Sequence, residues 1–204
     1  MRGTGPSARR AGRCSIRPPV PSLGRVFSIL MAGVIASIAL GACEASPGGP
    51  ASYAEGTIAA IMAADDRFDT LMKLTEQDMP PVALDSISTP ELDITFFAPT
   101  DDAFAALPPG VLEWLRNDDN VSELQLVYDH HVTRVSHSLP VLRSMIEDGV
   151  AEVEPLDGGP IRLSLVDGVL HVDEATVVEG DIEAVNGVIH VIDAVMIPDS
   201  VAIP

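Results

Sequence analysis

Apolar residues recur with a helical period in the first half of the chain, from Gly56 onward. Ile61 and Met62 follow Ile58 by three and four positions, which places all three on one helix face. Thr57 precedes them as a candidate N-cap. The pattern predicts these elements: helices at 57–62 and at 66–75, the second capped by Asp66; a loop or weak helix over 84–92; a strand over 94–97; and helices after Thr100, after Pro108 and from Asn120, a predicted cap, to His131.

The period changes to two in the second half. Apolar and polar residues alternate over 161–165, which predicts a strand with one solvated face. Asp167 and Gly168 then separate it from 169–172, as in a tight hairpin. Further strands are expected at 150–154, 176–178 and 188–197. The last is apolar on both faces and should be central, and helices followed by strands indicate an α+β domain.

The N-terminal segment has the pattern of an export signal. Six arginines and no acidic residue precede Cys43, and the apolar run over 26–40 is too short for an ordinary membrane span. The end of this run, Leu40-Gly41-Ala42-Cys43, resembles a bacterial lipoprotein signal. A secretory signal with an incidental cysteine and an uncleaved anchor are the alternatives.

The lipoprotein interpretation fixes the predicted organisation of the N-terminus. Residues 1–42 are the signal peptide, Cys43 is the lipidation site, and residues 43–54 form a flexible tether rich in Ala, Ser, Pro and Gly. The mature protein would be exported to the bacterial cell envelope and anchored by lipid, at the outer membrane or cell surface. With Cys14 removed and Cys43 acylated, no disulfide is expected.

The formal charge of −18 is unevenly distributed. Residues 43–204 contain all 30 acidic residues and 6 of the 12 basic ones, which gives this portion a formal charge of −24. It offers no net basic surface to a nucleic-acid backbone, so we expect no nucleic-acid partner. Its length is small for two independently folded cores, so we expect one domain.

Two longer motifs carry a family resemblance. The string over 95–104, Thr-Phe-Phe-Ala-Pro-Thr-Asp-Asp-Ala-Phe, resembles the first signature of the fasciclin domain family, with these matching positions: Thr95, Phe97, Ala98, Pro99, Thr100, Ala103 and Phe104. The string over 186–193 resembles the second signature, with these matching positions: Asn186, Gly187, His190, Val191, Ile192 and Asp193. The similarity covers residues 55–198 and leaves 199–204 as a C-terminal tail.

The resemblance implies a fold and a general role. The implied fold is a β-wedge or sandwich of about seven strands, with several short helices packed against it. Family members act mostly in cell adhesion and matrix contact, and bacterial ones are secreted or anchored at the surface. The implied partners are therefore a cell-surface or matrix protein, a polysaccharide or a second copy, together with the membrane through the N-terminal lipid.

Between its signatures the family usually carries a Tyr-His pair, and here the matching residues are His130 and His131. In some animal members this region is tied to integrin binding, which is not carried over because the tyrosine is missing and no Arg-Gly-Asp string occurs. On the predicted helix His131 shares a face with Leu124 and Tyr128, so it should point into the interior, whereas His130 is turned about 100° away. His190 should be another buried imidazole, with Asp193 on the opposite strand face.

The sequence lacks the parts of a catalytic site. No Gly-x-Ser-x-Gly string, phosphate-binding glycine loop or zinc-ligand spacing occurs, so we predict that the chain is not an enzyme and has no metal or other cofactor. Binding at the cell surface is the favoured function. A carrier of a carotenoid or lipid-like ligand is the first alternative, with these candidate groove residues: Met62, Phe68, Met72, Met79 and Trp114. A hydrolase using His130 or His171 with a carboxylate is the least favoured.

Overall fold

The computed structural model describes residues 53–203. Seven α-helices lie in this range: α1 (Ile58–Ala63), α2 (Asp69–Lys73), α3 (Pro81–Ser88), α4 (Asp101–Ala105), α5 (Val111–Leu115), α6 (Val121–His130) and α7 (Leu139–Glu147). Short turns of other helix types accompany them: η1 (Asp66–Phe68), η2 (Leu74–Asp78) and η3 (Asp118–Asn120). Seven strands complete the described part: β1 (Ile94–Pro99), β2 (Val132–Thr133), β3 (Glu152–Val153), β4 (Ile161–Val166), β5 (Val169–Val172), β6 (Ala175–Ala184) and β7 (Gly187–Ile192).

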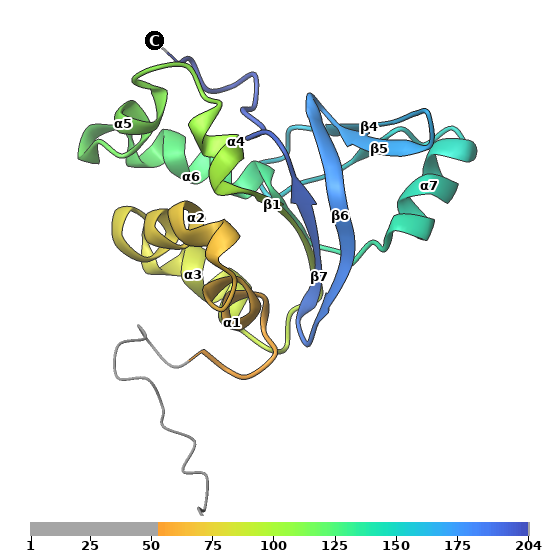
Figure 1. The fold of residues 1–204 in the computed structure, drawn as a ribbon, viewed down its shortest axis with the longest axis horizontal. Coiled ribbons are helices and arrows are strands. Elements are labelled where there is room, and N and C mark those ends of the chain that lie inside the picture. Colours follow the sequence, from red (N-terminus) through yellow and green to blue (C-terminus); the bar gives the residue numbers. More distant parts are fainter. Residues whose placement is uncertain (1–52, 204) are drawn as a thin grey trace, which may run out of the picture. The chain divides into compact units, whose positions relative to one another are not determined.

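The strands form one mixed sheet in the order β2-β1-β7-β6-β5-β4-β3 (Figure 1). β1 and β7 are parallel, in a register that runs from Ile94 opposite Gly187 to Pro99 opposite Ile192. The other neighbouring pairs are antiparallel. The predicted α+β class with seven strands and several short helices is confirmed. β7 is central as predicted, although the strand ends at Ile192 rather than at residue 197.

Two hydrophobic cores meet at the β1–β7 pair. Phe96, Ile189 and Val191 belong to the first core, which packs under helices α1–α6. Phe97 and Ile192 belong to the second, which β4–β6 and α7 enclose. Figure 1 shows helices α1–α6 on one side of these central strands and α7 on the other. Because successive side chains point to opposite faces of a strand, a run that is apolar at every position serves both cores.

Local capping explains where several helices begin. The hydroxyl groups of Thr57 and Thr100 accept hydrogen bonds from the amides of Ala60 and Ala103, each at 3.3 Å, which confirms both predicted caps. The predicted hairpin turn is confirmed as well. Asp167 and Gly168 have φ of 53° and 80°, the left-handed conformation that a two-residue hairpin requires.

Two predicted caps are wrong. Asp65, rather than Asp66, accepts the hydrogen bond from the amide of Arg67, at 3.0 Å. Asn120 does not cap α6, because its side-chain nitrogen donates instead to the carbonyl of Trp114, at 2.8 Å. A side chain that bonds to the preceding helix is held away from the first amides of the following helix and does not cap it. Sequence spacing does not reveal this competition.

The loop or weak helix expected over 84–92 is also corrected. The chain forms α3 here, with Pro81 at its first position, where the fixed φ of proline favours a helix start. Ala83 and Ile87, four residues apart, are fully buried against the first core. Ser86, Ser88 and Thr89, which suggested a loop, are half-buried and bond to carbonyls about one turn back, and the hydroxyl of Ser86 also lies 3.0 Å from that of Tyr128.

The sheet curls until its two ends nearly meet. β2 and β3 are the first and last strands in the order, and each has two residues. An isolated antiparallel bridge joins Thr133 to Pro155 across the gap. We call this junction between the two ends of the sheet the seam.

The predicted signal peptide 1–42, the lipidation site Cys43 and all of the tether up to residue 52 lie outside the described residues. The bounds of the domain, 55–198, and of the tail, 199–204, stay predictions, and Val201 packs on the first core. Among residues 53–203, none of the helices combines the length and the apolar character that a membrane span requires.

Gly187 is the glycine on which the central pairing depends. Its φ is 144°, and a Cβ atom there would lie 1.9 Å from the carbonyl oxygen of Ile94. We predict that Gly187→Ala lowers the free energy of unfolding by about 4 kcal/mol or more, or abolishes folding, because backbone rather than a flexible side chain is in the way. Urea unfolding of the full chain measures the loss.

Gly149→Ala is the matched control. Gly149 also has a positive φ, of 85°, yet a Cβ atom there would meet nothing within 4 Å. This variant should lose about 1 kcal/mol, the ordinary cost of a left-handed alanine. Equal losses in the two variants would show that the close approach to Ile94 contributes nothing.

Candidate functional site

His131 is a buried, neutral histidine, pointing into the interior as its position on α6 predicted. Its Nδ1 donates to the carbonyl of Val127 at 2.6 Å, and its Nε2 accepts from the amide of Met196 at 3.1 Å. Burial lowers the pKa of His131 to about 4, although the bond to Val127 acts in the opposite direction. Both ring nitrogens are occupied by backbone groups, so the ring fastens the chain after β7 to α6.

His190 on β7 has the same character. Its Nε2 donates to the carbonyl of His137 at 2.8 Å, and its Nδ1 accepts from the amide of Asp181 at 3.2 Å. Burial lowers the pKa of this imidazole, against the effect of the bond to His137. Asp193, exposed just beyond β7, does not approach His190; its carboxylate accepts from the amide of Thr176 at 2.6 Å.

His130 has a different environment, which the sequence did not indicate. It is turned away from the face of His131, yet its side chain is 6% exposed because two turns cover it. Nδ1 lies 3.1 Å from both carboxylate oxygens of Asp157, and Nε2 lies 3.1 Å from Oδ2 of Asp173. A neutral imidazole donates from one nitrogen, so two carboxylates at this distance favour the doubly protonated, charged ring.

The electrostatics of this cluster agree with a charged His130. Burial lowers the pKa of the imidazole, but hydrogen bonds to Asp173 and Asp157 outweigh it, and the net pKa is raised. Burial raises the pKa of Asp173, but the hydrogen bonds from His130 and from the amide of Arg162 together lower it by more, so the net pKa is below its ordinary value. His130 is also the last residue of α6, where the helix dipole favours a positive charge.

The signature residues of the first motif build the sheet rather than a reaction centre. Thr95, Phe97, Ala98 and Pro99 lie in β1, whose residues are all buried. Thr100, Ala103 and Phe104 form the start of α4, the last two buried in it. Thr95 has an additional role: its hydroxyl donates to the carbonyl of Val135 at 2.7 Å and accepts from the amide of His137 at 2.8 Å.

The second motif holds the helical layer. Asn186 is fully buried, accepts from the amide of Ile58 at 2.9 Å and donates to the carbonyl of Ile87 at 2.9 Å. Its side chain therefore joins α1 and α3 to the start of β7. Gly187, Val191 and Ile192 form the strand itself.

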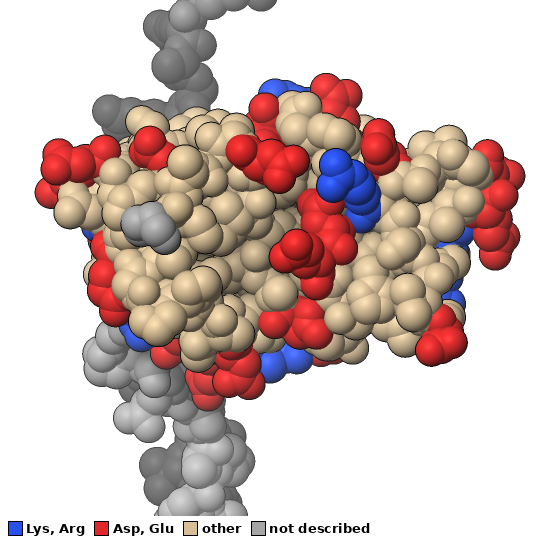
Figure 2. All heavy atoms as spheres, turned by 90° about the horizontal axis from the view of Figure 1, so that it is seen from above, with Lys and Arg blue, Asp and Glu red and all other residues tan. Residues whose placement is uncertain are grey.

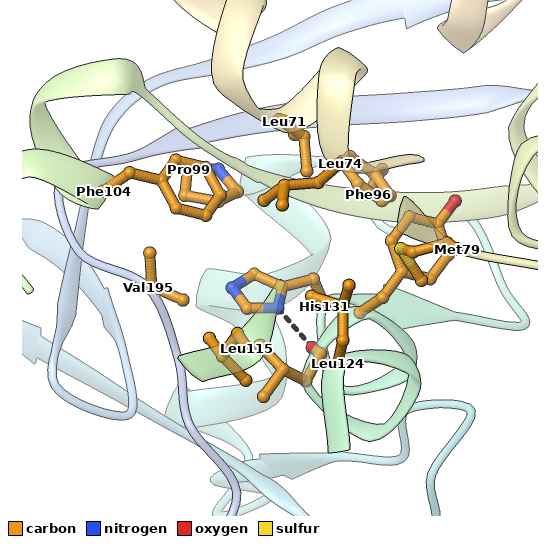
Figure 3. Close-up of a pocket in the computed structure, with 12 residues that line it drawn as sticks. Leu71, Leu74, Met79, Phe96, Pro99, Phe104, Leu115, Leu124, His131 and Val195 are labelled. Carbon is orange, nitrogen blue, oxygen red and sulfur yellow. Dashed lines mark hydrogen bonds between the residues drawn. The ribbon is translucent and has the colours of Figure 1, made fainter. Parts of the chain in front are cut away.

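An apolar pocket lies against His131 in the first core (Figure 3). Leu71, Leu74, Phe96 and Phe104 are among its walls, and the dashed line in Figure 3 is the bond from His131 to the carbonyl of Val127. About 20 Å³ is left between the side chains, room for a single water molecule. Of the five residues suggested for an apolar carrier, Met79 lines this pocket, while Met62, Phe68 and Met72 are buried core residues.

A larger hollow of about 410 Å³ lies at the seam, between the segments that follow β2 and contain β3. We call it the seam groove, and these residues line it: Thr133, Arg134, Val135, His137, Met145, Glu152, Val153, Glu154 and Pro155. Its volume is in the range of ligand-binding cavities. Arg134, Val135, Glu152 and Glu154 are exposed at its rim, whereas Val153 and Pro155 are buried.

Each wall of the seam groove is held by buried polar contacts. Thr95 and His190 fix the first wall through the backbone of Val135 and His137, as described above. The second wall ends at Leu156, whose amide donates to the carbonyl oxygens of Val132 at 2.8 Å and Asp129 at 3.1 Å. Asp157, bonded to His130, follows directly. The sequence did not predict this groove, because its walls lie about 20 residues apart in the chain and meet through the curvature of the sheet.

Residues 66–198 match the family model of the fasciclin domain. The chain belongs to the fasciclin domain family. Fasciclin domain proteins are generally non-catalytic and are associated with adhesion and binding. Within residues 53–203, no group of three or more His, Cys, Asp or Glu side chains is arranged to hold a metal ion.

Two proteins from Synechocystis sp. have similar sequences. Protein sll1483 is 36% identical over 126 residues, which are 62% of this chain and 64% of that protein. The uncharacterized protein sll1735 is 36% identical over 126 residues, which are 61% of this chain and 85% of that one. The chain therefore spans somewhat less than two thirds of sll1483.

The fold is similar to a solved structure, that of a FAS1 domain pair from the insect cell adhesion molecule fasciclin I. The TM-score is 0.60 at 18% identity, and the match covers 70% of this chain and 51% of that one. A likeness at this identity establishes the fold alone.

His131 provides a test of how burial sets acid stability. The folded state keeps this ring neutral down to about pH 4, while the unfolded chain takes up a proton below its ordinary value of about 6.5. The contribution of the neutral His131 ring to the free energy of unfolding is therefore fully present above about pH 6.5 and is lost as the pH falls toward 4. We predict that the unfolding free energy of the full chain falls by about 2–3 kcal/mol from this ring between pH 7.5 and 4.5.

His131→Leu should lose about 1–3 kcal/mol at pH 7.5, because it leaves two buried backbone groups without partners, but it should lose less stability on acidification than the natural chain. His171→Leu, on the solvated sheet face, is the control that keeps the full acid sensitivity. Urea unfolding at both pH values measures the difference. An unchanged acid sensitivity in His131→Leu would contradict the assignment.

Proposed function

We propose that this fasciclin domain protein is a lipid-anchored adhesion module that binds an extended, cationic segment of another surface protein in the seam groove. One observation carries the proposal: residues of both family motifs, Thr95 and His190, hold one wall of a groove of binding size, while His130, His131 and His190 have both ring nitrogens bonded to protein groups. A histidine so engaged has no free nitrogen to act as a catalytic base.

The shape of the seam groove supports an extended segment. β2 and β3, the two end strands of the sheet, lie at its sides; each has only two residues, so an extended segment would gain few backbone hydrogen bonds there and would bind mainly through its side chains. Buried Val153 and Pro155, with half-buried Met145, form an apolar floor for a side chain of the partner. These features favour a protein segment over a polysaccharide.

The charge distribution supports a cationic partner. Glu152 on β3 and Glu154, which follows the strand, are exposed at the rim of the seam groove, where they outnumber the exposed Arg134. Figure 2 shows acidic side chains spread over the visible face, with few basic ones among them. With a formal charge of −24 over residues 43–204, the module attracts cationic partners and repels a second copy of itself.

The groove is tested by reversing its rim charges. Cells that lack the natural gene are made to produce either the natural chain or the full chain with Glu152→Lys and Glu154→Lys. Attachment of the cells to the surface should be about tenfold lower with the double variant. Quantitative attachment assays at equal surface expression measure this. Protease treatment of the attachment surface should abolish binding; persistence after that treatment would indicate a polysaccharide partner.

Glu91→Lys with Asp93→Lys is the matched control. These acidic residues are also exposed and two positions apart, and they do not line the seam groove. Their reversal changes the net charge equally and should leave most attachment intact. If both double variants lose attachment to the same extent, net charge rather than the groove is responsible and the proposed site is wrong.

The lipid anchor has a separate test. The natural chain should incorporate radioactive palmitate and remain with the membrane fraction, because an acylated Cys43 holds it there through buried methylene groups. Cys43→Ser should incorporate none and appear in the soluble fraction. Equal labelling of the two chains would contradict lipidation at Cys43.

A further inference from the structure

His130 links the seam groove to the state of a buried charge cluster. The segment that forms the second wall, Glu152–Pro155, runs directly into Asp157, whose side chain is 3% exposed and bonded to His130. On the other side of the ring, Asp173 has a φ of 48°; its amide donates to the carbonyl of Arg162 at 2.8 Å, and its carboxylate accepts from the amide of Arg162 at 2.9 Å. One imidazole therefore joins α6 to the β3–β4 and β5–β6 turns.

We infer that charged His130 is a clasp that closes the seam, and that loss of its proton loosens the second wall and makes binding in the seam groove pH-dependent. This inference rests on the proposed function of the groove, but the clasp itself is measurable without a partner. The geometry carries it: both ring nitrogens lie 3.1 Å from carboxylate oxygens, and the side chains of His130, Asp157 and Asp173 are 6%, 3% and 19% exposed.

Deprotonation has a defined physical consequence. The neutral ring keeps one N–H donor, so one nitrogen would present a lone pair to a carboxylate at hydrogen-bond distance. Either the hydrogen bond to Asp157 or the one to Asp173 is then lost, and the contact between that carboxylate and the ring becomes repulsive. A buried carboxylate without its cation is costly, and movement of the turn toward water relieves that cost.

The other charged groups around His130 make this loss more severe. On α6, Asp129 is half-buried; burial raises its pKa, the bond from Gln125 lowers it, and the charge of Asp157 raises it further. Arg134 after β2 attracts Asp129, and Arg162 on β4 attracts Asp173; both arginines are exposed. His131 follows the end of α6, and because burial lowers its pKa to about 4 it is neutral near pH 6.5 and above. Asp157 and Asp173 thus bond to the one buried cation, while the charge of Asp129 acts on Asp157.

The contacts at the seam show what would move. Thr133 and Pro155 form an isolated bridge between the sheet ends, and Leu156 donates to Val132 and Asp129. Asp157 is the next residue. The clasp therefore lies one residue beyond the backbone contacts that close the second wall, and its release exposes these contacts to opening.

Hydrogen exchange on the detergent-solubilised full chain, read by mass spectrometry, tests the clasp. Exchange at the imidazole carbon between the nitrogens gives the titration midpoint of His130, with His171 as a reference in the same chain. Amide exchange of a peptide covering 152–158 is compared with one covering β1 at each pH. We expect the relative protection of 152–158 to fall by up to about tenfold per pH unit above the His130 midpoint.

Asp173→Asn and Asp167→Asn form a matched pair of variants. Both aspartates occupy left-handed positions in hairpin turns, with φ of 48° and 53°, and asparagine adopts that conformation readily. Removing the carboxylate of Asp173 should lower the His130 midpoint by about one pH unit or more and shift the loss of protection with it. Asp167→Asn should change neither. His130→Gln should make the relative protection of 152–158 independent of pH.

The outcomes separate the clasp from the proposed function. If the midpoint of His130 lies below the ordinary histidine value of about 6.5, or if protection of 152–158 does not follow it, the clasp is wrong whatever the groove binds. If protection follows the midpoint but the rim reversal at Glu152 and Glu154 leaves attachment unchanged, the clasp stands and the proposed binding site fails. Attachment that declines at the same pH as the protection supports both.

Discussion

The parallel pairing of β1 with β7 is the constraint on which the rest of the structure depends. It brings the two family motifs side by side, and it begins where Gly187 lies against the backbone of Ile94 with no room for a Cβ atom. Both faces of the pair are buried, so each strand contributes side chains to two cores. Thr95 from one strand and His190 from the other also hold the first wall of the seam groove.

Much of the fold could be predicted because it depends on local sequence. The caps Thr57 and Thr100, the Asp167-Gly168 turn and the central position of β7 each follow from a few neighbouring residues. The interior position of His131 follows from helical periodicity alone. The motifs supplied the family, and with it the expectation of about seven strands with short helices packed against them; the order of the strands was not predicted.

The candidate site could not be predicted, because contacts between distant segments create it. His130 is turned away from the core face of α6 as its spacing requires, yet it is buried by two turns that lie 27 and 43 residues further along the chain. The side chain of Asn120 found a partner in the preceding helix for the same kind of reason. The seam groove depends on sheet curvature, for which a single sequence carries no direct signal.

The two end strands of the sheet, β2 and β3, have only two residues each, and such short edges affect how the protein behaves at high concentration. Exposed strand edges are templates onto which further chains add, and long, flat ones promote fibril growth. β2 and β3 offer little such template, and the bridge between Thr133 and Pro155 joins them across the gap. A sheet that almost closes on itself leaves an opening of limited size while it resists uncontrolled assembly.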